Sequence, residues 1–482
     1  MSLKLLDQLI TNSNIAFGTS GARGLVADFT DEVCAAFAQS FVKVMLRNFS
    51  FDRVALGIDN RPSSGQMASA CAGAIQALGI AVDYYGVLPT PALAYQAMQD
   101  KVPALMVTGS HIPFERNGLK FYRPDGEINK DDEQAILGVA ELLTPFMPFF
   151  PLENTAATDN YIKRYIDIYP PQMLVGKRIG IYEHSSAGRD LYHKVFRLLG
   201  AEIISLERTN DFVPIDTEAV SISDQIKAQN WSAQFGFDMI FSTDGDGDRP
   251  LIADEQGQWL RGDIVGLLCA KALAIQSLVV PVSCNTAIEQ TGVFDKVIRT
   301  KIGSPYVIAA FADLSGVVAG FEANGGFLLG SDVLIADKVL KALPTRDALL
   351  PGLALLALAG EKPLSQLVCA LPQRYTASDR LQNIDTQWSK NFIDAAAKSP
   401  KRLLAQLGLG SRQMRSLDQT DGLRLQFSDS DSDILHFRPS GNAPELRVYV
   451  ESSSQRKVEE LLGLALEKLK NFELEAETNV DE

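Results

Sequence analysis

The chain has 482 residues, of which 46% are hydrophobic and 22% are charged, with 36 Gly and 22 Pro. These proportions are typical of a folded protein of several domains, and they exclude collagen-like and largely disordered chains. The formal net charge is −14, from 45 Lys and Arg against 59 Asp and Glu. This sign argues against a nucleic-acid partner, and an anionic substrate would need a local basic pocket.

Two strand-helix-strand units are predicted in the first half of the chain. The hydrophobic pattern predicts a strand over residues 53–58, then a polar turn, a helix over 66–78 and a second strand over 80–84. The same order recurs between a strand at 177–181 and another at 202–206. Repeated βα units of this kind indicate related α/β domains in series.

The second half of the chain begins with a shorter version of this unit and then changes character. The shorter version covers residues 278–297. Alternating patterns then predict strands at 423–427, 434–437 and 446–451, followed by an amphipathic helix over 455–472. We therefore expect three α/β domains followed by a smaller α+β domain.

Cysteine usage and the apolar runs indicate where the protein resides. The cysteines are odd in number, far apart and without a CxxC pair, which argues against a disulfide framework and a thiolate metal site. They are Cys34, Cys71, Cys269, Cys284 and Cys369. No secretory signal is visible, and no apolar run reaches the roughly 20 residues that a membrane span needs. We expect a cytoplasmic protein with no membrane partner.

The acidic loop after a predicted strand is the strongest local signal. Asp244, Asp246 and Asp248 occupy every second position and are separated by glycines. Three carboxylates on a loop that can curl converge on one hard cation, such as magnesium or calcium. An EF-hand would place its last ligand at Glu255, but it requires Gly where this chain has Arg249, and a strand precedes the loop.

A second signal is a serine placed where an apolar run ends. The segment Thr-Gly-Ser-His-Ile-Pro places Ser110 and His111 at the expected carboxyl edge of a sheet, where α/β proteins bind ligands. A G-x-S-x-G elbow is absent, so a hydrolase triad is disfavoured. An ordinary turn serine is the alternative, but Lys120 brings a cation close to the same loop.

Two glycine-rich runs carry weaker signals. Residues 17–24 combine backbone freedom with Arg23 and could present N–H groups and a guanidinium to phosphate, although the run lacks the P-loop ending and is equally compatible with a flexible loop. Residues 320–326 place Glu322 and Asn324 on a loop after a strand. A carboxylate and an amide of this kind suit sugar hydroxyls.

The last domain contains a candidate anion site. Arg438, Ser440, Gly441, Asn442 and Arg447 lie within ten residues of one another. Small residues with free N–H groups between two arginines favour phosphate binding. A hairpin turn with surface arginines is the alternative.

In this order and spacing, these segments resemble the α-D-phosphohexomutase family, which includes phosphomannomutase and phosphoglucomutase. The resemblance extends from Phe17 to Glu451. It implies three related α/β domains with mixed sheets sandwiched by helices, followed by a C-terminal α+β domain like the TATA-box-binding fold. The boundaries we expect are 1–153, 154–256, 257–371 and 372–482.

The resemblance also implies the reaction. The family interconverts hexose 6-phosphate and hexose 1-phosphate through a phosphoserine, here Ser110, and a hexose 1,6-bisphosphate intermediate that also serves as activator. Mannose is the sugar we expect, with phosphoglucomutase and phosphoglucosamine mutase as alternatives. A metal-dependent sugar phosphatase and a non-catalytic calcium- or sugar-binding protein are the other classes considered. The expected partner is a small phosphosugar, and the expected state is a monomer or a homodimer.

The residue roles implied by the resemblance fall into three groups. Ser110 and the three loop aspartates, Asp244, Asp246 and Asp248, bind Mg²⁺. The catalytic group is Ser110, His111, Lys120, Arg249 and Arg23, with His111 and Lys120 both candidates for the general base. The substrate-binding group is Glu322, Asn324, Lys301, Arg438, Ser440, Gly441, Asn442 and Arg447.

Some positions depart from the usual family pattern. The serine loop reads Thr-Gly-Ser-His-Ile-Pro where Thr-Ala-Ser-His-Asn-Pro is usual. The sugar loop reads Phe-Glu-Ala-Asn-Gly-Gly instead of Gly-Glu-x-Ser-Gly-His, so Asn324 stands in place of a serine and the usual histidine is missing. The phosphate loop reads Ser-Gly-Asn-Ala-Pro in place of Ser-Gly-Thr-Glu-Pro. These changes leave the sugar preference open.

Overall fold

The computed structural model describes residues 4–18, 21–429, 431–440, 444–470 and 472. The chain forms two compact units. The larger consists of Met1–Val279, Phe294–Ile298 and Gly303–Val368, and the smaller of Val280–Val293, Arg299–Ile302 and Cys369–Glu482. Each unit is described by itself below.

The first sheet of the larger unit is mixed, with the strand order β1-β2-β6-β5-β3-β4 and with β7 paired to β6. Its strands are β1 (Ala16–Phe17), β2 (Ala22–Leu25), β3 (Arg53–Ile58), β4 (Ala81–Val87), β5 (Ala104–Val107), β6 (Arg116–Arg123) and β7 (Gly126–Glu127). Strands β4, β3 and β5 run parallel, and β6 is antiparallel to both β5 and β2. This order brings the carboxyl end of β5 beside the start of β6.

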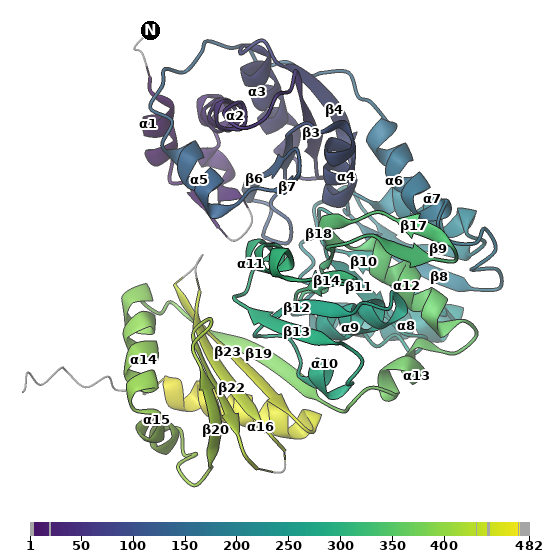
Figure 1. Ribbon diagram of the computed structural model, residues 1–482, viewed down its shortest axis with the longest axis vertical. Helices are drawn as coiled ribbons and strands as arrows, with labels where there is room; N and C mark the ends of the chain where they lie inside the picture. Colours follow the sequence, from purple (N-terminus) through teal and green to yellow (C-terminus); the bar gives the residue numbers. More distant parts are fainter. Residues whose placement is uncertain (1–3, 19–20, 430, 441–443, 471, 473–482) are drawn as a thin grey trace, which may run out of the picture. The chain divides into compact units, whose positions relative to one another are not determined.

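Helices cover both faces of this sheet (Figure 1). They are α1 (Leu6–Thr11), α2 (Asp31–Met45), α3 (Ser64–Gln76), α4 (Thr90–Asp100) and α5 (Lys130–Leu137). Helices α3 and α4 both pack on β3. They connect strands in opposite directions along the sheet, so right-handed crossovers place them on opposite faces. Phe37, Phe41 and Phe121 form the aromatic centre of the core under α2.

The second sheet follows the same plan with four strands in the order β11-β10-β8-β9. The strands are β8 (Arg178–His184), β9 (Glu202–Arg208), β10 (Met239–Thr243) and β11 (Pro250–Ala253), with helices α6 (Ala156–Ile166), α7 (Arg189–Leu198) and α8 (Ile222–Phe235). Strand β10 is parallel to β8 but antiparallel to β11. The turn between β10 and β11 is the acidic loop.

The third sheet has the order β13-β12-β14-β15-β18. Its strands are β12 (Ser277–Pro281), β13 (Lys296–Thr300), β14 (Val318–Phe321), β15 (Phe327–Leu329) and β18 (Leu343–Asp347), with a separate hairpin of β16 (Val333–Ile335) and β17 (Lys338–Leu340). Its helices are α9 (Gly262–Ala272), α11 (Ser304–Ala309), α12 (Leu349–Ala359) and α13 (Leu364–Cys369), whereas α10 (Ala287–Gln290) falls in the smaller unit. Helix α12 is apolar on nearly all sides because α9 and β11 both pack against it.

The smaller unit contains a five-stranded antiparallel sheet in the order β19-β23-β22-β21-β20. Its elements are β19 (Tyr375–Gln382), α14 (Thr386–Lys398), α15 (Pro400–Gln406), β20 (Met414–Asp418), β21 (Leu423–Phe427), β22 (Ile434–Pro439), β23 (Glu445–Ser452) and α16 (Gln455–Leu469). Alternate strand residues such as Phe437 and Val448 form one core with the three helices. Arg438 and Arg447 occupy the alternate positions and so lie on the opposite face.

The predicted fold class of α/β domains followed by an α+β domain is confirmed, and the strongest periodic segments have nearly the predicted bounds. β3 and β21 begin and end at the predicted residues. The predicted strand-helix-strand unit over residues 278–297 differs most from the structure, because its helix α10 has only four residues. Strands β19 and β20 and helices α14 and α15 were not predicted. The four domain boundaries stay a prediction.

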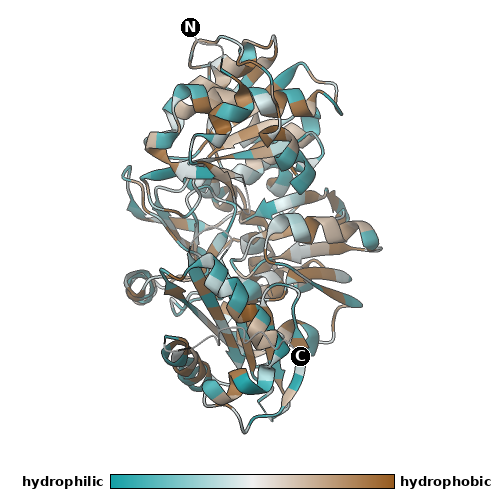
Figure 2. Ribbon diagram, turned by 90° about the vertical axis from the view of Figure 1, so that its left-hand side faces the viewer, coloured by the Kyte–Doolittle hydropathy of each residue, from teal (hydrophilic) through white to brown (hydrophobic). Residues whose placement is uncertain are grey.

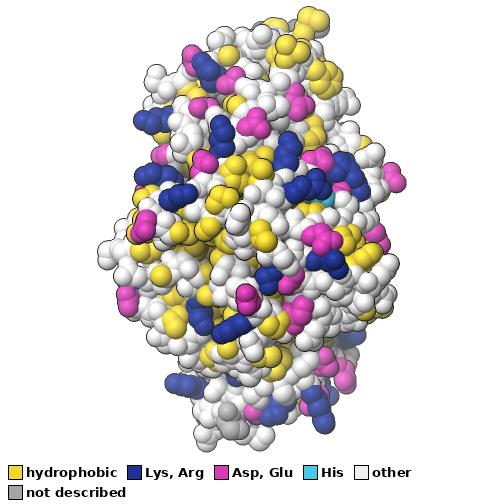
Figure 3. All heavy atoms as spheres, turned by 90° about the vertical axis from the view of Figure 1, so that its right-hand side faces the viewer, with side chains coloured by type: hydrophobic (Ala, Val, Ile, Leu, Met, Phe, Trp, Pro, Cys, Tyr) yellow, Lys and Arg dark blue, Asp and Glu magenta, His cyan; other side chains and the backbone are white. Residues whose placement is uncertain are grey.

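The distribution of hydrophobic and charged residues over the helices and the surface is the one expected from the composition of a folded protein. Figure 2 shows hydrophobic and hydrophilic residues alternating along many of the helices. On the face drawn in Figure 3, acidic and basic side chains are interspersed and do not form one large patch of a single sign. Within the described part of the chain, no helix combines the length and the hydrophobicity required to cross a bilayer.

Candidate active site

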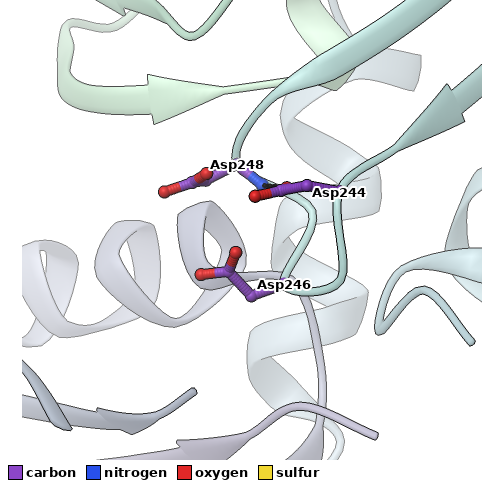
Figure 4. Close-up of side chains that lie close together, drawn as sticks. All are labelled: Asp244, Asp246 and Asp248. Carbon is purple, nitrogen blue, oxygen red and sulfur yellow. Dashed lines mark hydrogen bonds between the residues drawn. The ribbon is translucent and has the colours of Figure 1, made fainter. Parts of the chain in front are cut away.

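The acidic loop gathers three buried carboxylates at the end of β10. Asp244, Asp246 and Asp248 are each at most 1% exposed, and their nearest oxygens lie within 4.8 Å of one another (Figure 4). Gly247 permits the tight turn with a φ of +69°. Burial and the charges of its two neighbours raise the pKa of Asp244 well above its usual range. A bound cation would relieve both the burial of this charge and its repulsion by Asp246 and Asp248.

The loop fits a divalent cation of the magnesium type. Among the residues that the structure describes, no donor hydrogen-bonds to Asp246 Oδ1 or Asp248 Oδ1, although both atoms are buried. Buried acceptors without partners cost free energy unless an ion or water uses them. Hard carboxylate oxygens on three residues, with a hydroxyl nearby, form the kind of ligand set that Mg²⁺ prefers.

Ser110 lies directly against this loop. Its hydroxyl donates to Asp244 Oδ2 at 2.6 Å, and its side chain is fully buried. The residue has a φ of +56°, an unusual backbone conformation for serine, and its N–H donates to the hydroxyl of Thr108. Strain of this kind persists only where neighbours hold the backbone in place, and it turns the hydroxyl out of the strand toward the acidic loop.

Two residues that the sequence analysis did not single out hold the serine loop. Asp59, at the end of β3, accepts the Thr108 hydroxyl at 2.7 Å and pairs with Arg61 at 3.2 Å. Arg61 donates to the backbone carbonyl of Ser110 at 2.9 Å and to those of Pro113 and Arg116. The predicted polar turn after β3 therefore contains the supports of the serine loop.

The cations predicted around the serine lie at the acidic loop, with Lys120 buried and Arg23 and Arg249 half-buried. Lys120 Nζ donates to Asp246 at 2.5 Å and to Asp248 at 2.6 Å. Arg249 approaches Asp248 at 3.6 Å and Asp244 at 3.9 Å. Burial and the nearby Arg249 lower the pKa of Arg23 to about 10, so it keeps its charge at neutral pH. Three cations thus accompany the carboxylate cluster.

His111 is a neutral imidazole in this arrangement. Arg249 Nη1 lies 2.9 Å from its Nδ1, and since the guanidinium can only donate, Nδ1 accepts. Burial, together with the charges of Arg249 and Arg23, lowers the pKa of His111 well below its usual value. Ser110 Oγ lies 3.3 Å from the same nitrogen. His111 contacts the serine and Lys120 contacts two aspartates of the acidic loop, so the general base stays a matter of proposal.

The glycine-rich loop of the third sheet connects to the acidic loop through an arginine. Glu322, 4% exposed, accepts from Arg346 Nη1 at 2.9 Å, and Arg346 Nε donates to Asp248 at 3.0 Å. Asn324 uses its side-chain oxygen to accept the N–H of Gly326, and its carbonyl accepts the hydroxyl of Thr217. Arg346 was missed by the sequence analysis; an Arg-Asp pair at the end of the short strand β18 was the available signal.

The remaining predicted residues belong to the smaller unit. Arg438 and Arg447 are direct cross-strand neighbours on β22 and β23, and Arg380 on β19 faces Arg447 in the same row. Arg438 donates to Asp421 at 2.8 Å, and Ser440 is buried. Like charges placed opposite one another destabilise a sheet unless anions offset them.

Three other predicted residues also belong to the smaller unit. Lys301 is exposed in the segment that follows β13. Gly441 and Asn442 fall outside the described residues. The assignment of all these residues to phosphate or sugar binding stays a prediction.

A buried histidine next to the acidic loop provides a pH-dependent prediction. His184 lies at the end of β8 and donates Nε2–H to the carbonyl of Thr243, the residue before Asp244. Burial lowers its pKa to about 4. Between pH 4 and about 6.5 the unfolded chain therefore binds more protons at this site, and stability rises with pH.

We expect His184→Gln, which can keep the N–H donor, to flatten this dependence. In the parent protein the loss at His184 between pH 7 and pH 4 is expected to reach about 3 kcal/mol. Urea unfolding followed across this range in both proteins measures the difference. An equally steep dependence in the variant would show that His184 does not titrate in this way.

Family models match much of the chain. The model for "Phosphoglucomutase/phosphomannomutase, alpha/beta/alpha domain I" matches residues 14–143, the model for domain III of the same group matches 261–375, and its C-terminal domain matches 390–466. A phosphomannomutase of Salmonella muenchen is 57% identical over 467 residues, covering 96% of this chain and 97% of the relative.

The chain belongs to the phosphoglucomutase/phosphomannomutase family. A second phosphomannomutase of the family, from Sinorhizobium fredii, is 41% identical and covers 93% of this chain and 98% of its own length. A phosphoglucosamine mutase of Synechococcus is 29% identical, with coverages of 94% and 95%. Family membership confirms the resemblance drawn from the sequence and makes this chain an isomerase of the phosphotransferase mutase type.

Solved structures support the fold. A phosphoglucomutase/phosphomannomutase family protein from Burkholderia thailandensis aligns with a TM-score of 0.73 at 19% identity, covering 94% of this chain and 97% of the other. A phosphoglucomutase from Paramecium, parafusin, aligns with a TM-score of 0.69 at 14% identity and covers 94% of each chain. At these identities the comparison speaks for the architecture alone.

Proposed function

We propose that this protein is a phosphomannomutase that interconverts mannose 6-phosphate and mannose 1-phosphate. The observation that carries the proposal is the hydrogen bond from the buried Ser110 hydroxyl to Asp244, within a cluster of three carboxylates and several cations. The preference for mannose is supported by the two relatives at 57% and 41% identity, both of which are phosphomannomutases.

The proposed reaction uses Ser110 as a phosphoryl store. In the phosphorylated enzyme, the bond between phosphorus and Ser110 Oγ breaks as a bond forms to the free hydroxyl of the sugar phosphate. The proton of that hydroxyl goes to a base, for which His111 and Lys120 are the candidates. The hexose 1,6-bisphosphate then turns and returns its other phosphate to Ser110, so that the net change is an isomerisation.

Positive charge around Ser110 suits this transfer. Phosphoryl transfer depends mainly on positioning and on stabilising the charge of the transferred oxygens. Arg249 and Arg23 carry positive charge next to the serine loop, and Lys120 donates to Asp246 in the acidic loop. A Mg²⁺ ion held by Asp244, Asp246 and Asp248 would neutralise the developing charge. Arg61 keeps the serine loop in the conformation that presents the hydroxyl.

We assign substrate recognition to residues of both units. Glu322 and Asn324 would bind sugar hydroxyls, because a buried carboxylate and an amide can each pair with two hydroxyl groups. Arg438, Ser440, Arg447 and Lys301, with Gly441 and Asn442 of the adjoining segment, would hold the phosphate that is not being transferred. The row of arginines on β22 and β23, with Arg380 on β19, supports this assignment, because its three positive charges face two paired carboxylates, Asp421 and Glu445, and a phosphate can offset the remainder.

The test is a mutase assay on the purified protein with Mg²⁺ and a hexose 1,6-bisphosphate activator. We expect mannose 1-phosphate to be converted to mannose 6-phosphate, with a kcat/KM at least equal to that for glucose 1-phosphate. Inorganic phosphate is measured in the same samples. Preferential turnover of glucose 1-phosphate or glucosamine 1-phosphate would reassign the sugar, and stoichiometric phosphate release without isomerisation would make the protein a phosphatase.

A further inference from the structure

Arg346 is a buried cation held between two loops of the larger unit. It is 2% exposed, and its guanidinium donates to Asp248 of the acidic loop at 3.0 Å and to Glu322 of the sugar loop at 2.9 Å. A buried guanidinium that pairs with two carboxylates fixes the orientation of both, because its donors form a rigid planar fork. Arg346 thus links the proposed metal ligands to the proposed sugar ligand.

Asp347, the residue after Arg346, holds the chain in place at this end of β18. Asp347 accepts the hydroxyls of Tyr161 and Tyr165 from α6, and its Oδ1 accepts the N–H of Leu349 at the start of α12. Strand β18, which carries Arg346 and Asp347, pairs with β15, the strand that leaves the sugar loop. The backbone at this end of β18 is therefore held by α6, by the start of α12 and by β15.

The stem of Arg346 occupies the space beside Gly326. A Cβ atom placed on Gly326 would lie 2.5 Å from Arg346 Cδ and 2.7 Å from its Cγ. Gly326 is not among the glycines with positive φ, so its backbone would accept another residue. Glycine is therefore required at position 326 because a side chain there would overlap Arg346, and not because of the backbone conformation. Arg346 cannot give way cheaply, because both of its carboxylate partners hold its far end.

We propose that Arg346 acts as the positioning residue that holds Glu322 toward the substrate and Asp248 toward the metal. This inference rests on the proposed function for the roles of Glu322 and Asp248. The distances alone, without the proposed function, show that the side chain of Arg346 occupies the space beside position 326.

Unfolding measurements on the metal-free protein test whether Arg346 occupies the space beside position 326. We expect Gly326→Ala to raise the unfolding equilibrium constant by about tenfold or more in the parent protein, because the new methyl displaces Arg346. In an Arg346→Ala background the same change should be neutral or stabilising, since Ala restricts the unfolded chain. Equal costs of Gly326→Ala in the two backgrounds would overturn the proposal.

Gly325 provides the matched control. Its φ is +88°, so Gly325→Ala is strained by its backbone and should cost the same whether or not Arg346 is present. Removing Arg346 takes the paired cation from the buried Glu322 and leaves Asp248 with Lys120 and Arg249, so a second test covers the case in which Arg346→Ala does not fold. Gly326→Ala alone then decides: it should lower kcat/KM by about tenfold or more in a folded protein. An unchanged kcat/KM would overturn the proposal.

The positioning role is tested by a double-mutant cycle in the mutase assay. Arg346→Met keeps the volume of the stem but removes the charge, and Glu322→Gln removes the charge of its partner. We expect each to raise KM and lower kcat, and the double variant to lie within about threefold of the worse single variant, because the two act as one unit. A purely structural role would reduce kcat with KM unchanged, and fully multiplicative losses would mean that the residues act separately; either result would overturn the role.

The two tests separate this inference from the proposed function. If the parent protein shows no mutase activity, the proposed function fails in that assay before any variant is made. The unfolding cycle needs no activity and still decides whether Arg346 occupies the space at position 326.

Discussion

Ser110→Ala is expected to lower mutase activity by about 10³-fold or more while leaving the protein folded. The reason is that the hydroxyl of Ser110 is the only part of this side chain that the proposed reaction uses, and the alanine Cβ fits the same space. The backbone strain at φ +56° is the same for alanine as for serine. The measurement is kcat/KM for mannose 1-phosphate, together with intact mass spectrometry of protein incubated with a hexose bisphosphate.

The matched control for this change is Ser232→Ala. Ser232 lies buried in α8, and its hydroxyl has no hydrogen-bond partner within the described part of the chain. Its removal should leave both activity and phosphorylation at the parent level. Activity of Ser110→Ala within about tenfold of the parent would contradict the phosphoserine mechanism. Phosphate still incorporated into Ser110→Ala would place the acceptor on another residue.

Asp248→Asn is expected to have the second largest effect, on activity and on stability together. Asp248 pairs with Lys120 and Arg346, and it is one of the three proposed metal ligands. The asparagine keeps the shape but leaves buried cations with fewer counter-charges. Activity should fall by about 10³-fold, which is the effect of losing one charge-stabilising group in an active site. The free energy of unfolding should fall by about 3–5 kcal/mol, as for other broken buried ion pairs.

The pH dependence of Asp248 gives the sign of a further effect. Arg346 and Lys120 lower the pKa of Asp248, against the opposite effect of burial. A carboxyl group whose pKa is lower in the folded state stabilises the fold above its unfolded pKa, and this stability is lost as the pH falls. The parent protein should therefore lose more stability than Asp248→Asn when the pH is lowered below about 4.

Asp254→Asn serves as the matched control for Asp248→Asn. Asp254 follows β11 and is also buried, but its carboxylate accepts the backbone N–H groups of Gln256 and Gln258 in a local turn. An asparagine oxygen can accept the same bonds, and the turn lies outside the acidic cluster. This variant should keep its activity. A parallel loss of activity in both variants would point to general destabilisation and not to the loss of a metal ligand.

The proposed roles of the two units are tested by different measurements. The larger unit contains the phosphoryl store, the acidic loop and the sugar loop, and its buried contacts between Ser110 and Asp244 and between Arg346 and Glu322 can be tested without the substrate. The smaller unit supplies a row of arginines on one face of a sheet, and its role is tested through KM for the sugar phosphate. Variants of Arg438 or Arg447 should therefore raise KM more than they lower kcat, since they hold the phosphate that does not react.

The sequence alone determined the features that depend on neighbouring residues in the chain. The period of hydrophobic residues located β3, β8, β21 and α16 to within a few residues, because each buries one face or one run against a core. The acidic loop and the serine loop were also identified from the sequence alone. Their chemistry depends on a few consecutive residues, with glycines allowing the turn and carboxylates or a hydroxyl supplying the ligand.

Tertiary structure decided which of these groups act on one another. Asp59 and Arg61 resembled an ordinary polar turn, and Arg346 was one charged residue at the end of a strand. Their functions arise because strand order brings the ends of β3, β5 and β18 next to loops far away in the sequence, and buried charges must then find partners. Such pairing has no period and no fixed spacing along the chain, so only the folded protein reveals it.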